Sequence, residues 1–251
     1  MKKLFTLVMA LAACQLMAQK VKDDIVYFED SRVRNSRLSL ALVANPNFSD
    51  RNLLNDEINN GGGLDLSSTK AKGGIAFNYN LDVFFSLSSA LDIGVGFGRA
   101  QAVWSISDAQ LYASENFPLD IQDTLLVDAS FSANMWTVPL KLNFNTTISD
   151  IFELEVIPTV SMNFIDSYEM DYTSQSAQNS RSGILDLTQL TRNTNWRVGI
   201  SLGGTWYFTE NWGFFVRVNG NYMLNSMIER SGYPRQTVYS VGSDIGLKVH
   251  L

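Results

Sequence analysis

Cysteine and histidine are almost absent from this chain of 251 residues, which contains one of each. Cys14 lies in the amino-terminal segment and His250 is the penultimate residue. These absences exclude a disulfide framework and a histidine-based site in the loops, and thiolate chemistry is lost as well if the segment that carries Cys14 is cleaved off. The paired loop acids Asp120 and Asp123 are interpreted as solvated, and scattered loop carboxylates would bind calcium only weakly. We therefore expect no catalytic residue, no cofactor site and no metal site.

Two further features are missing. There is no basic cluster, and the formal net charge of −6 argues against nucleic acid as a partner. There is also no apolar run of about 20 residues after the amino terminus, so no membrane helix is expected. The hydrophobic content of 45% and aromatic content of 12% exclude a disordered chain and favour one folded domain.

What the chain does contain is strict alternation of apolar and polar residues. It is clearest in two runs, 196–208 and 212–222, which are separated by a short polar break. Twelve residue steps at about 3.3 Å reach about 40 Å. At a tilt of about 40° this length projects to about 30 Å, the thickness of a bilayer core. The segment therefore predicts a transmembrane β-hairpin.

The same period predicts strands at 37–43, 74–85, 91–104, 135–145, 152–164, 196–208, 212–223 and 237–251. Three links are tight turns (86–90, 146–150 and 209–211), and four are long loops (45–72, 105–133, 166–194 and 225–236). Within the second long loop, 124–127 could extend a strand above the membrane. Arg99 breaks the alternation and predicts a bulge or an emergence into the headgroups. Pro139 predicts a weakly paired point.

These elements predict an all-β fold, an eight-stranded antiparallel up-and-down transmembrane β-barrel with short periplasmic turns and long extracellular loops. The protein is then expected in the Gram-negative outer membrane, with both termini in the periplasm. Alternation places charged residues of both signs inside, as a structural lumen network of Arg37, Asp82, Asp92, Lys141, Glu153, Glu155, Arg197, Arg217, Asp244 and Lys248. A barrel of this size is filled by side chains, so we expect a salt-bridged lumen without an open channel.

Aromatic residues at the ends of the strands are expected at the two membrane interfaces. They are Trp104, Trp136, Trp196, Phe208, Trp212, Tyr222 and Tyr239.

The amino-terminal segment reads as a signal peptide (1–18), followed by a periplasmic tail (19–36) and the barrel domain (37–251). Leu11-Ala12-Ala13-Cys14 is a rival signal, because it resembles a lipobox that would place a lipid on Cys14. Cleavage after Ala18 is favoured, since the segment before the cysteine is short. The tail itself is interpreted as a linker, with a plug or docking strand as the alternative.

Three stretches carry a family resemblance: MWTVPLKLNF (135–144), FFSLSSALDIGVGFG (84–98) and WYFTENWGFFVRVNGNY (206–222). They resemble the outer-membrane β-barrel family common in Bacteroidota, with an OmpA/OmpX-like small barrel and a PorT-like subfamily as one option. The likeness covers roughly 37–251. Its motifs are architectural, so the resemblance implies a barrel and transfers no functional residue.

The leading hypothesis is a structural or interaction barrel of the cell envelope, with recognition loops on its surface. The alternative is a PorT-like secretion-associated barrel or a porin-like barrel for small solutes. A soluble ligand-binding barrel would need the opposite polarity, apolar inside and polar outside. Expected partners are outer-membrane lipid, the barrel-assembly machinery, and an extracellular ligand or secretion-system protein bound through the loops.

Overall fold

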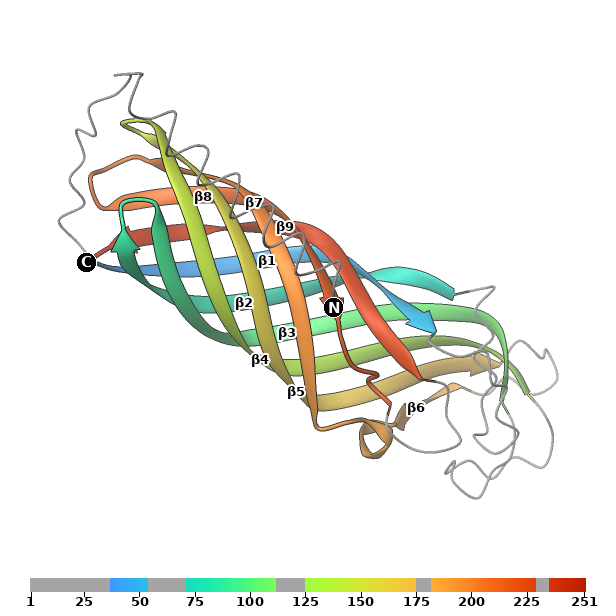
Figure 1. Cartoon of the computed structure of the whole chain (residues 1–251). Coiled ribbons are helices and arrows are strands. Elements are labelled where there is room, and N and C mark those ends of the chain that lie inside the picture. Colours follow the sequence, from blue (N-terminus) through green and yellow to red (C-terminus); the bar gives the residue numbers. More distant parts are fainter. Residues whose placement is uncertain (1–36, 54–70, 112–124, 175–181, 229–234) are drawn as a thin grey trace. The chain divides into compact units, whose positions relative to one another are not determined.

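The computed structural model describes residues 37–53, 71–111, 125–174, 182–228 and 235–251, which belong to one compact unit (Figure 1). Strands and one short 3-10 helix make up its regular structure. They are β1 (Leu38–Leu53), β2 (Ala71–Ser88), β3 (Leu91–Leu111), β4 (Leu125–Ser149), β5 (Phe152–Ser174), β6 (Ser182–Asp186), η2 (Thr188–Leu190), β7 (Thr194–Tyr207), β8 (Trp212–Met223) and β9 (Gln236–His250). The predicted signal peptide, Cys14, the tail (19–36), Asp120 and Asp123 lie outside the described residues.

Eight of these strands form a closed antiparallel ring. Each pairs with its neighbours in the order β4-β3-β2-β1-β9-β8-β7-β5, and an additional pairing of β4 with β5 closes the ring. The short strand β6 pairs with β5 beyond the point where β7 leaves it. The predicted eight-stranded up-and-down barrel is confirmed. Closure pairs the main-chain groups that an open sheet would expose at its edges.

The strands are longer than the sequence predicted. β4 contains 25 residues and β5 contains 23. At about 3.3 Å per residue β4 reaches about 80 Å, far more than a bilayer core requires. The long links predicted at 45–72, 105–133 and 166–194 are therefore wrong in their bounds, because parts of them continue the strands. The suggestion that 124–127 extends a strand is confirmed, since β4 begins at Leu125.

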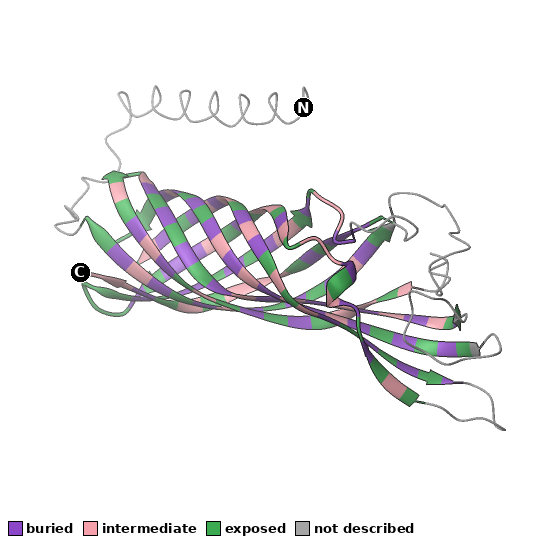
Figure 2. Ribbon diagram, turned by 90° about the horizontal axis from the view of Figure 1, so that it is seen from below, coloured by how far each residue is buried: buried purple, intermediate pink, exposed green. Residues whose placement is uncertain are grey.

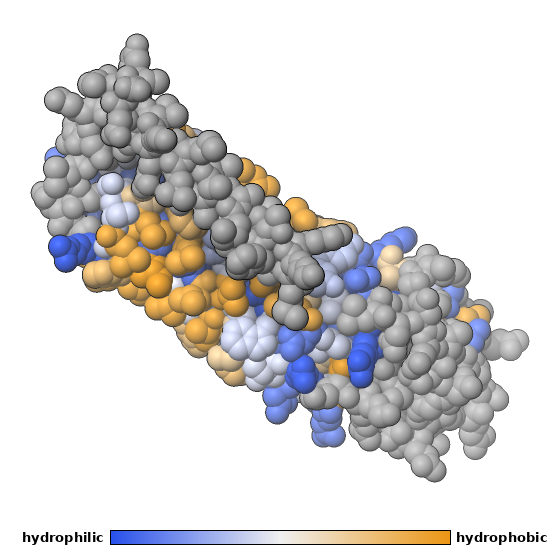
Figure 3. Space-filling view, in the orientation of Figure 1, coloured by the Kyte–Doolittle hydropathy of each residue, from blue (hydrophilic) through white to orange (hydrophobic). Residues whose placement is uncertain are grey.

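Buried and exposed residues alternate along the ring, as Figure 2 shows. Large apolar side chains on the outer face are exposed, among them Leu81, Val95, Leu140, Val160, Val218 and Val241. Figure 3 shows hydrophobic surface over the part of the barrel nearer the short turns and a more hydrophilic surface towards the other end. Such a band is typical of the lipid-facing surface of an outer-membrane barrel. In the described part of the chain, no helix meets the length and hydropathy that a membrane crossing requires.

A β-bulge in β5 marks the end of this band. Met135 of β4 pairs with Ile165, whereas the residue before Met135 pairs with Ser167, which leaves Asp166 as an extra residue. Odd-numbered residues of β5 are buried below the bulge and even-numbered residues above it. We call the part beyond the bulge the extension: residues 100–111, 125–135 and 165–174, together with β6.

Polarity is reversed in the extension. On β5, Glu169 and Asp171 are exposed, whereas Met170 and Tyr172 are buried. On β4, Phe131 is buried between serines that are more exposed. The outer face of the extension is therefore polar and its inner face apolar, the opposite of the barrel below the bulge.

Two possibilities were predicted at Arg99, a bulge or an emergence from the membrane. The pairing of β2 with β3 shifts between Tyr79, the partner of Arg99, and Gly73, but β3 itself is regular there. β3 and β4 keep one register from Leu91 to Ile106, so β3 contains no bulge at Arg99. Arg99 continues the outer face, where it forms an ion pair with Asp166 and stacks 4.6 Å from the centre of the Trp136 ring. It thus lies at the level of the β5 bulge.

Because the alternation in β3 is unbroken from Leu91 to Ile106, Trp104 points inward and is fully buried. Its predicted place at the membrane interface is wrong. Pro139 has no partner residue in β3, although the register on either side of it is unchanged. The weakly paired point predicted there is confirmed, as expected for a residue that lacks a backbone donor.

Candidate functional site

The barrel interior contains the candidate site, and its lower part is centred on Glu155 of β5. The carboxylate is fully buried and accepts hydrogen bonds from Arg217 Nε at 2.8 Å and Lys248 Nζ at 2.9 Å. Thr205 Oγ1 at 2.8 Å and Asn143 Nδ2 at 3.2 Å complete its partners. One carboxylate thus holds two cations from β8 and β9 across the lumen. We call these five residues the Glu155 network.

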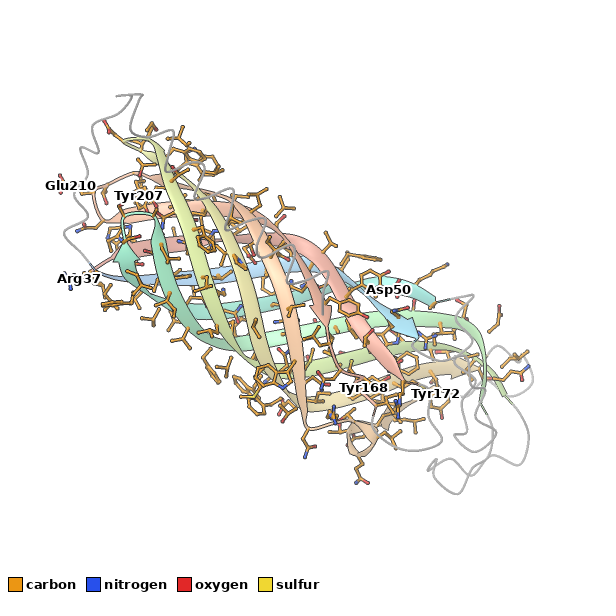
Figure 4. The ribbon with its side chains drawn as sticks, in the orientation of Figure 1. Arg37, Asp50, Tyr168, Tyr172, Tyr207 and Glu210 are labelled. Atoms are coloured by element: carbon orange, nitrogen blue, oxygen red, sulfur yellow. The ribbon has the colours of Figure 1, made fainter. Side chains whose placement is uncertain are left out.

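A second acid lies closer to the short turns. Glu153 is 3.9 Å from Lys248 Nζ and accepts a hydrogen bond of 2.9 Å from the Tyr207 hydroxyl. The same hydroxyl lies 2.8 Å from His250 Nε2, and the two rings stack. Figure 4 shows Tyr207 at the end of the barrel that also carries Arg37 and Glu210. These contacts link β5, β7 and β9 at the end of the barrel that contains the short turns and the last described residue.

The other inward acids are held in different ways. Asp82 is buried and forms an ion pair with Lys141. Asp92 accepts hydrogen bonds of 3.0 Å from the amides of Asn143 and Asn145. Amide donors therefore contribute to holding this buried carboxylate.

Asp244 lies higher in the lumen and is half-buried. Its carboxylate accepts hydrogen bonds from Asn45 at 2.7 Å, Asn219 at 2.8 Å and Ser201 at 2.8 Å. Arg197, also half-buried, donates a long hydrogen bond of 3.4 Å to Thr137 Oγ1. This middle zone is polar, and its two charged side chains are more exposed than those of the Glu155 network.

The structure thus brings Glu153, Glu155, Arg217 and Lys248 into one group, and Asp82 and Lys141 into another. Arg37 is exposed before the first strand, so its predicted place in the lumen network is wrong. Arg37 lies one residue before β1 begins, so it is not part of the closed sheet. Six of the predicted interface aromatics lie on the outer face: Trp136, Trp196, Phe208, Trp212, Tyr222 and Tyr239.

The upper part of the interior has entirely different chemistry. Here the inner face of the extension and the segments above it form a buried apolar cluster, which we call the extension cluster. Its members are Ala100, Ala102, Trp104, Ile106, Ala109, Val127, Ala129, Phe131, Ala133, Met135, Tyr168, Met170, Tyr172, Leu185, Leu187, Leu190, Met223, Met227, Ile228 and Val238. Sequence reasoning missed this cluster because most of its residues were assigned to loops and Trp104 was assigned to the interface. Five members fell within predicted strands: Ala100, Ala102, Met135, Met223 and Val238.

Three aromatic rings form the centre of the extension cluster. Trp104 and Phe131 stack at 5.7 Å between ring centres, and Tyr168 lies 5.9 Å from Trp104 and 6.0 Å from Phe131. Figure 4 shows Tyr168 and Tyr172 at the end of the molecule opposite Tyr207. Ring contacts at these distances stabilise a core beyond the apolar area that they bury.

A few polar groups adjoin these rings. Gln236 Nε2 donates a 3.0 Å hydrogen bond to the Tyr168 hydroxyl, and Arg51 of β1 is buried nearby. Burial raises the pKa of Tyr168 above its usual range, so the phenol stays neutral. Burial also lowers the pKa of the Arg51 guanidinium, whereas Tyr168 and Asp50 act in the opposite direction.

Two segments of the chain cover the cluster. In the first, which includes η2, Leu187 N donates to Tyr168 O at 2.7 Å. In the second, Met227 N donates to Gln236 O at 2.8 Å, and an isolated bridge joins Thr191 to Ile228. Side chains add to these bonds, because Thr188 Oγ1 accepts from Tyr168 N at 3.0 Å and Ser226 Oγ accepts from Gln236 N at 3.1 Å. The cover is therefore fastened to β5 and β9 by both main-chain and side-chain hydrogen bonds.

No protein-family model and no curated protein matches this chain. Among solved structures, similarity extends to Neisserial surface protein A, with a TM-score of 0.46 and 10% identity over 86% of this chain and 98% of that chain. The outer membrane protease OmpT from Escherichia coli gives a TM-score of 0.47 and 10% identity over 91% of this chain and 99% of that chain. A major outer membrane protein from Thermus thermophilus gives a TM-score of 0.43 and 10% identity over 85% of this chain and 99% of that chain.

Two of these similar structures are outer membrane proteins and the third is a surface protein. The fold assignment itself rests on the strand order and closure described above. Within the described ranges, no group of three or more histidine, cysteine, aspartate or glutamate side chains is placed to hold a metal ion. The chemistry available in the described interior is therefore that of buried ion pairs below and of apolar contacts above.

Proposed function

We propose that this protein is an integral outer-membrane interaction barrel, whose lumen does not conduct and whose extension binds partners outside the cell. The observation that carries the proposal is the burial of both interior zones. The Glu155 network occupies the barrel below, and the extension cluster occupies the interior above. An eight-stranded barrel has room for little more than its own side chains.

The positions of the chain ends support an orientation. Leu251 N donates to Leu38 O at 2.9 Å, so the first and last described strand ends adjoin, on the side of the short turns (Figure 1). In outer-membrane barrels the short turns face the periplasm. We therefore place both ends in the periplasm and the extension outside the cell.

Conductance across a planar lipid bilayer tests the closed lumen. The purified barrel, shown to be folded by its faster migration in an unboiled gel, should give no stable conductance steps in salt solution. Reproducible steps would refute the closed lumen and favour the small-solute alternative, with the middle zone around Asp244 and Arg197 as the polar pathway. Co-purification with a secretion apparatus, without conductance, would identify the partner class as PorT-like.

Orientation is tested by cysteine labelling on intact cells, with Cys14 changed to serine to remove the only native thiol. Thr173→Cys places a thiol on the exposed face of the extension, and Glu210→Cys places one on a short turn. A membrane-impermeant maleimide should label the first variant on intact cells and the second only after the outer membrane is permeabilised. The reverse pattern would refute the orientation.

A further inference from the structure

The extension cluster is unusual for a core because methionine is concentrated in it. The chain contains eight methionines, of which three lie within the first 17 residues. Of the other five, Met135, Met170, Met223 and Met227 all belong to the cluster. Methionine is unbranched and polarizable, and it is over-used at surfaces that adapt to different apolar ligands. The cluster can therefore repack around a guest more readily than one built from branched residues.

Two polar atoms in the cluster region have no partner among the described residues. Trp104 Nε1 and Gln236 Oε1 are both fully buried and make no hydrogen bond there. Exchanging the oxygen and nitrogen positions of the Gln236 amide does not change this. In either orientation one of the two atoms binds the Tyr168 hydroxyl and the other has no partner. A buried polar group without a partner is costly, and a purely structural core would favour phenylalanine over tryptophan here.

The two unpaired groups adjoin the same side chain. Trp104 of β3 packs against the Tyr168 ring, and Gln236 of β9 binds the Tyr168 hydroxyl. Arg51 of β1 is buried, pairs across the sheet with Val238 of the cluster and interacts electrostatically with Tyr168. Polar groups from β1, β3 and β9 therefore lie around Tyr168 within an otherwise apolar surrounding, and ligand sites combine an apolar lining with a few polar groups in the same way.

We propose that the extension cluster binds a single-chain amphiphile, an aliphatic chain that ends in a carboxyl or hydroxyl group. The aliphatic part lies among the methionines, and the polar end accepts a hydrogen bond from Trp104 Nε1 and pairs with the free end of the Gln236 amide. The segments around Leu187 and Met227 cover the site and admit the ligand by opening the hydrogen bonds that fasten them to β5 and β9. This inference concerns the extension alone and does not depend on whether the lumen conducts.

Photolabelling of the wild-type protein tests the site without any mutation. The barrel is reconstituted in lipid nanodiscs and irradiated with dodecanoic acid that carries a terminal diazirine. Adducts mapped by mass spectrometry should fall on cluster residues such as Met170, Met223 and Met227. Adducts confined to the outer faces of the strands would refute the proposal. A diacyl phospholipid with the same diazirine, placed in the disc, identifies the source: cluster adducts from this lipid alone would assign the site to membrane lipid and overturn the single-chain assignment.

Trp104→Phe then tests the polar contact, because it removes the indole N–H and retains an aromatic ring. Loss of one hydrogen bond to a buried group should weaken dodecanoic acid binding by about tenfold. Trp136→Phe, on the outer face, is the matched control and should bind as the wild type does. Dodecan-1-ol should compete with the probe and dodecane should compete poorly. Equal competition by both, or unchanged affinity in a folded Trp104→Phe variant, would refute the polar part of the site; if that variant does not fold, the competition result decides.

Discussion

Replacing Glu155 with glutamine should destabilise the barrel severely. The carboxylate is the shared partner of Arg217 and Lys248, whose nitrogens lie 2.8 and 2.9 Å from it, and all three side chains are buried. Glutamine keeps the shape but removes the charge, so two buried cations lose their principal anion. Breaking a buried ion pair by removing one partner costs about 3–5 kcal/mol. We expect the free energy of unfolding to fall by at least about 3 kcal/mol, because two cations are affected.

The assay is urea unfolding in lipid vesicles, followed by the fraction of protein that migrates as folded barrel in an unboiled gel. Asp166→Asn is the control, because it removes an ion pair with Arg99 whose side chains are 31% and 45% exposed. A pair of this kind contributes at most about 1 kcal/mol. If Glu155→Gln costs less than about 1 kcal/mol, or no more than the control, the Glu155 network does not hold the lower barrel together.

Three further outcomes are expected. Gly96→Ala should lower the free energy of unfolding by about 1–3 kcal/mol, because an added Cβ would collide with the Asp82 carboxylate. Gly220→Ala, whose added Cβ would have nothing within 4 Å, should change it by less than about 0.5 kcal/mol. Urea unfolding measures both variants, and equal losses would contradict the packing argument. Tyr168 has a raised pKa in the folded state, so above pH about 10 the unfolded chain loses a proton that the folded chain keeps, and the free energy of unfolding should fall as the pH rises. This fall should be shallower in Tyr168→Phe, and identical slopes in the two proteins would contradict the prediction. Tyr207→Phe should destabilise by about 1–2 kcal/mol in the same assay, since the Glu153 carboxylate loses its hydroxyl donor; no loss would show that this end of the barrel is held by other contacts.

The ring could be predicted because lipid imposes a simple pattern on the sequence. On β2, the outward residues are Phe77, Tyr79 and Leu81 and the inward residues are Asn78, Asn80 and Asp82, as alternation alone indicated. The pattern is readable because a hydrocarbon exterior and a polar interior differ at every second residue. Strand number, order and direction then follow from the alternation of short and long links.

The extension cluster escaped the same reasoning although its signal is present. Residues 168–172 and 129–135 alternate at period two, like the strands below them. Their polar face points outward, however, and strands were expected to end where the bilayer does. Without the assumption that strand length equals membrane thickness, Tyr168 and Met170 would have been assigned to the inside. The extra residue Asp166, which resets the parity of β5, has no clear signature in a single sequence.

Alternation along a strand also predicts which face a charged residue occupies, but it does not predict which residue it pairs with. Glu155 and Lys248 were both expected inside, but their hydrogen bond depends on stagger across the ring, joining β5 to β9 through the lumen. Asp92 illustrates the gap, because alternation did not single out Asn143 and Asn145, whose amides donate to it. Arg37 illustrates the other limit, since alternation was continued one residue past the end of the sheet.

The reversal of polarity at the β5 bulge explains why one barrel needs two kinds of interior. Below Asp166 the exterior is apolar, so apolar side chains are stable on the outer face and the narrow lumen contains polar groups. These groups must be paired because little water reaches them. Beyond Asp166 the exterior is polar, and apolar side chains such as Trp104 are stabilised only by burial inside. The Arg99–Asp166 pair and the Trp136 ring mark the boundary on the outside. The two halves therefore depend on different forces: a change that neutralises charge acts on the Glu155 network, whereas a change in apolar contact acts on the extension and leaves the ring below it intact.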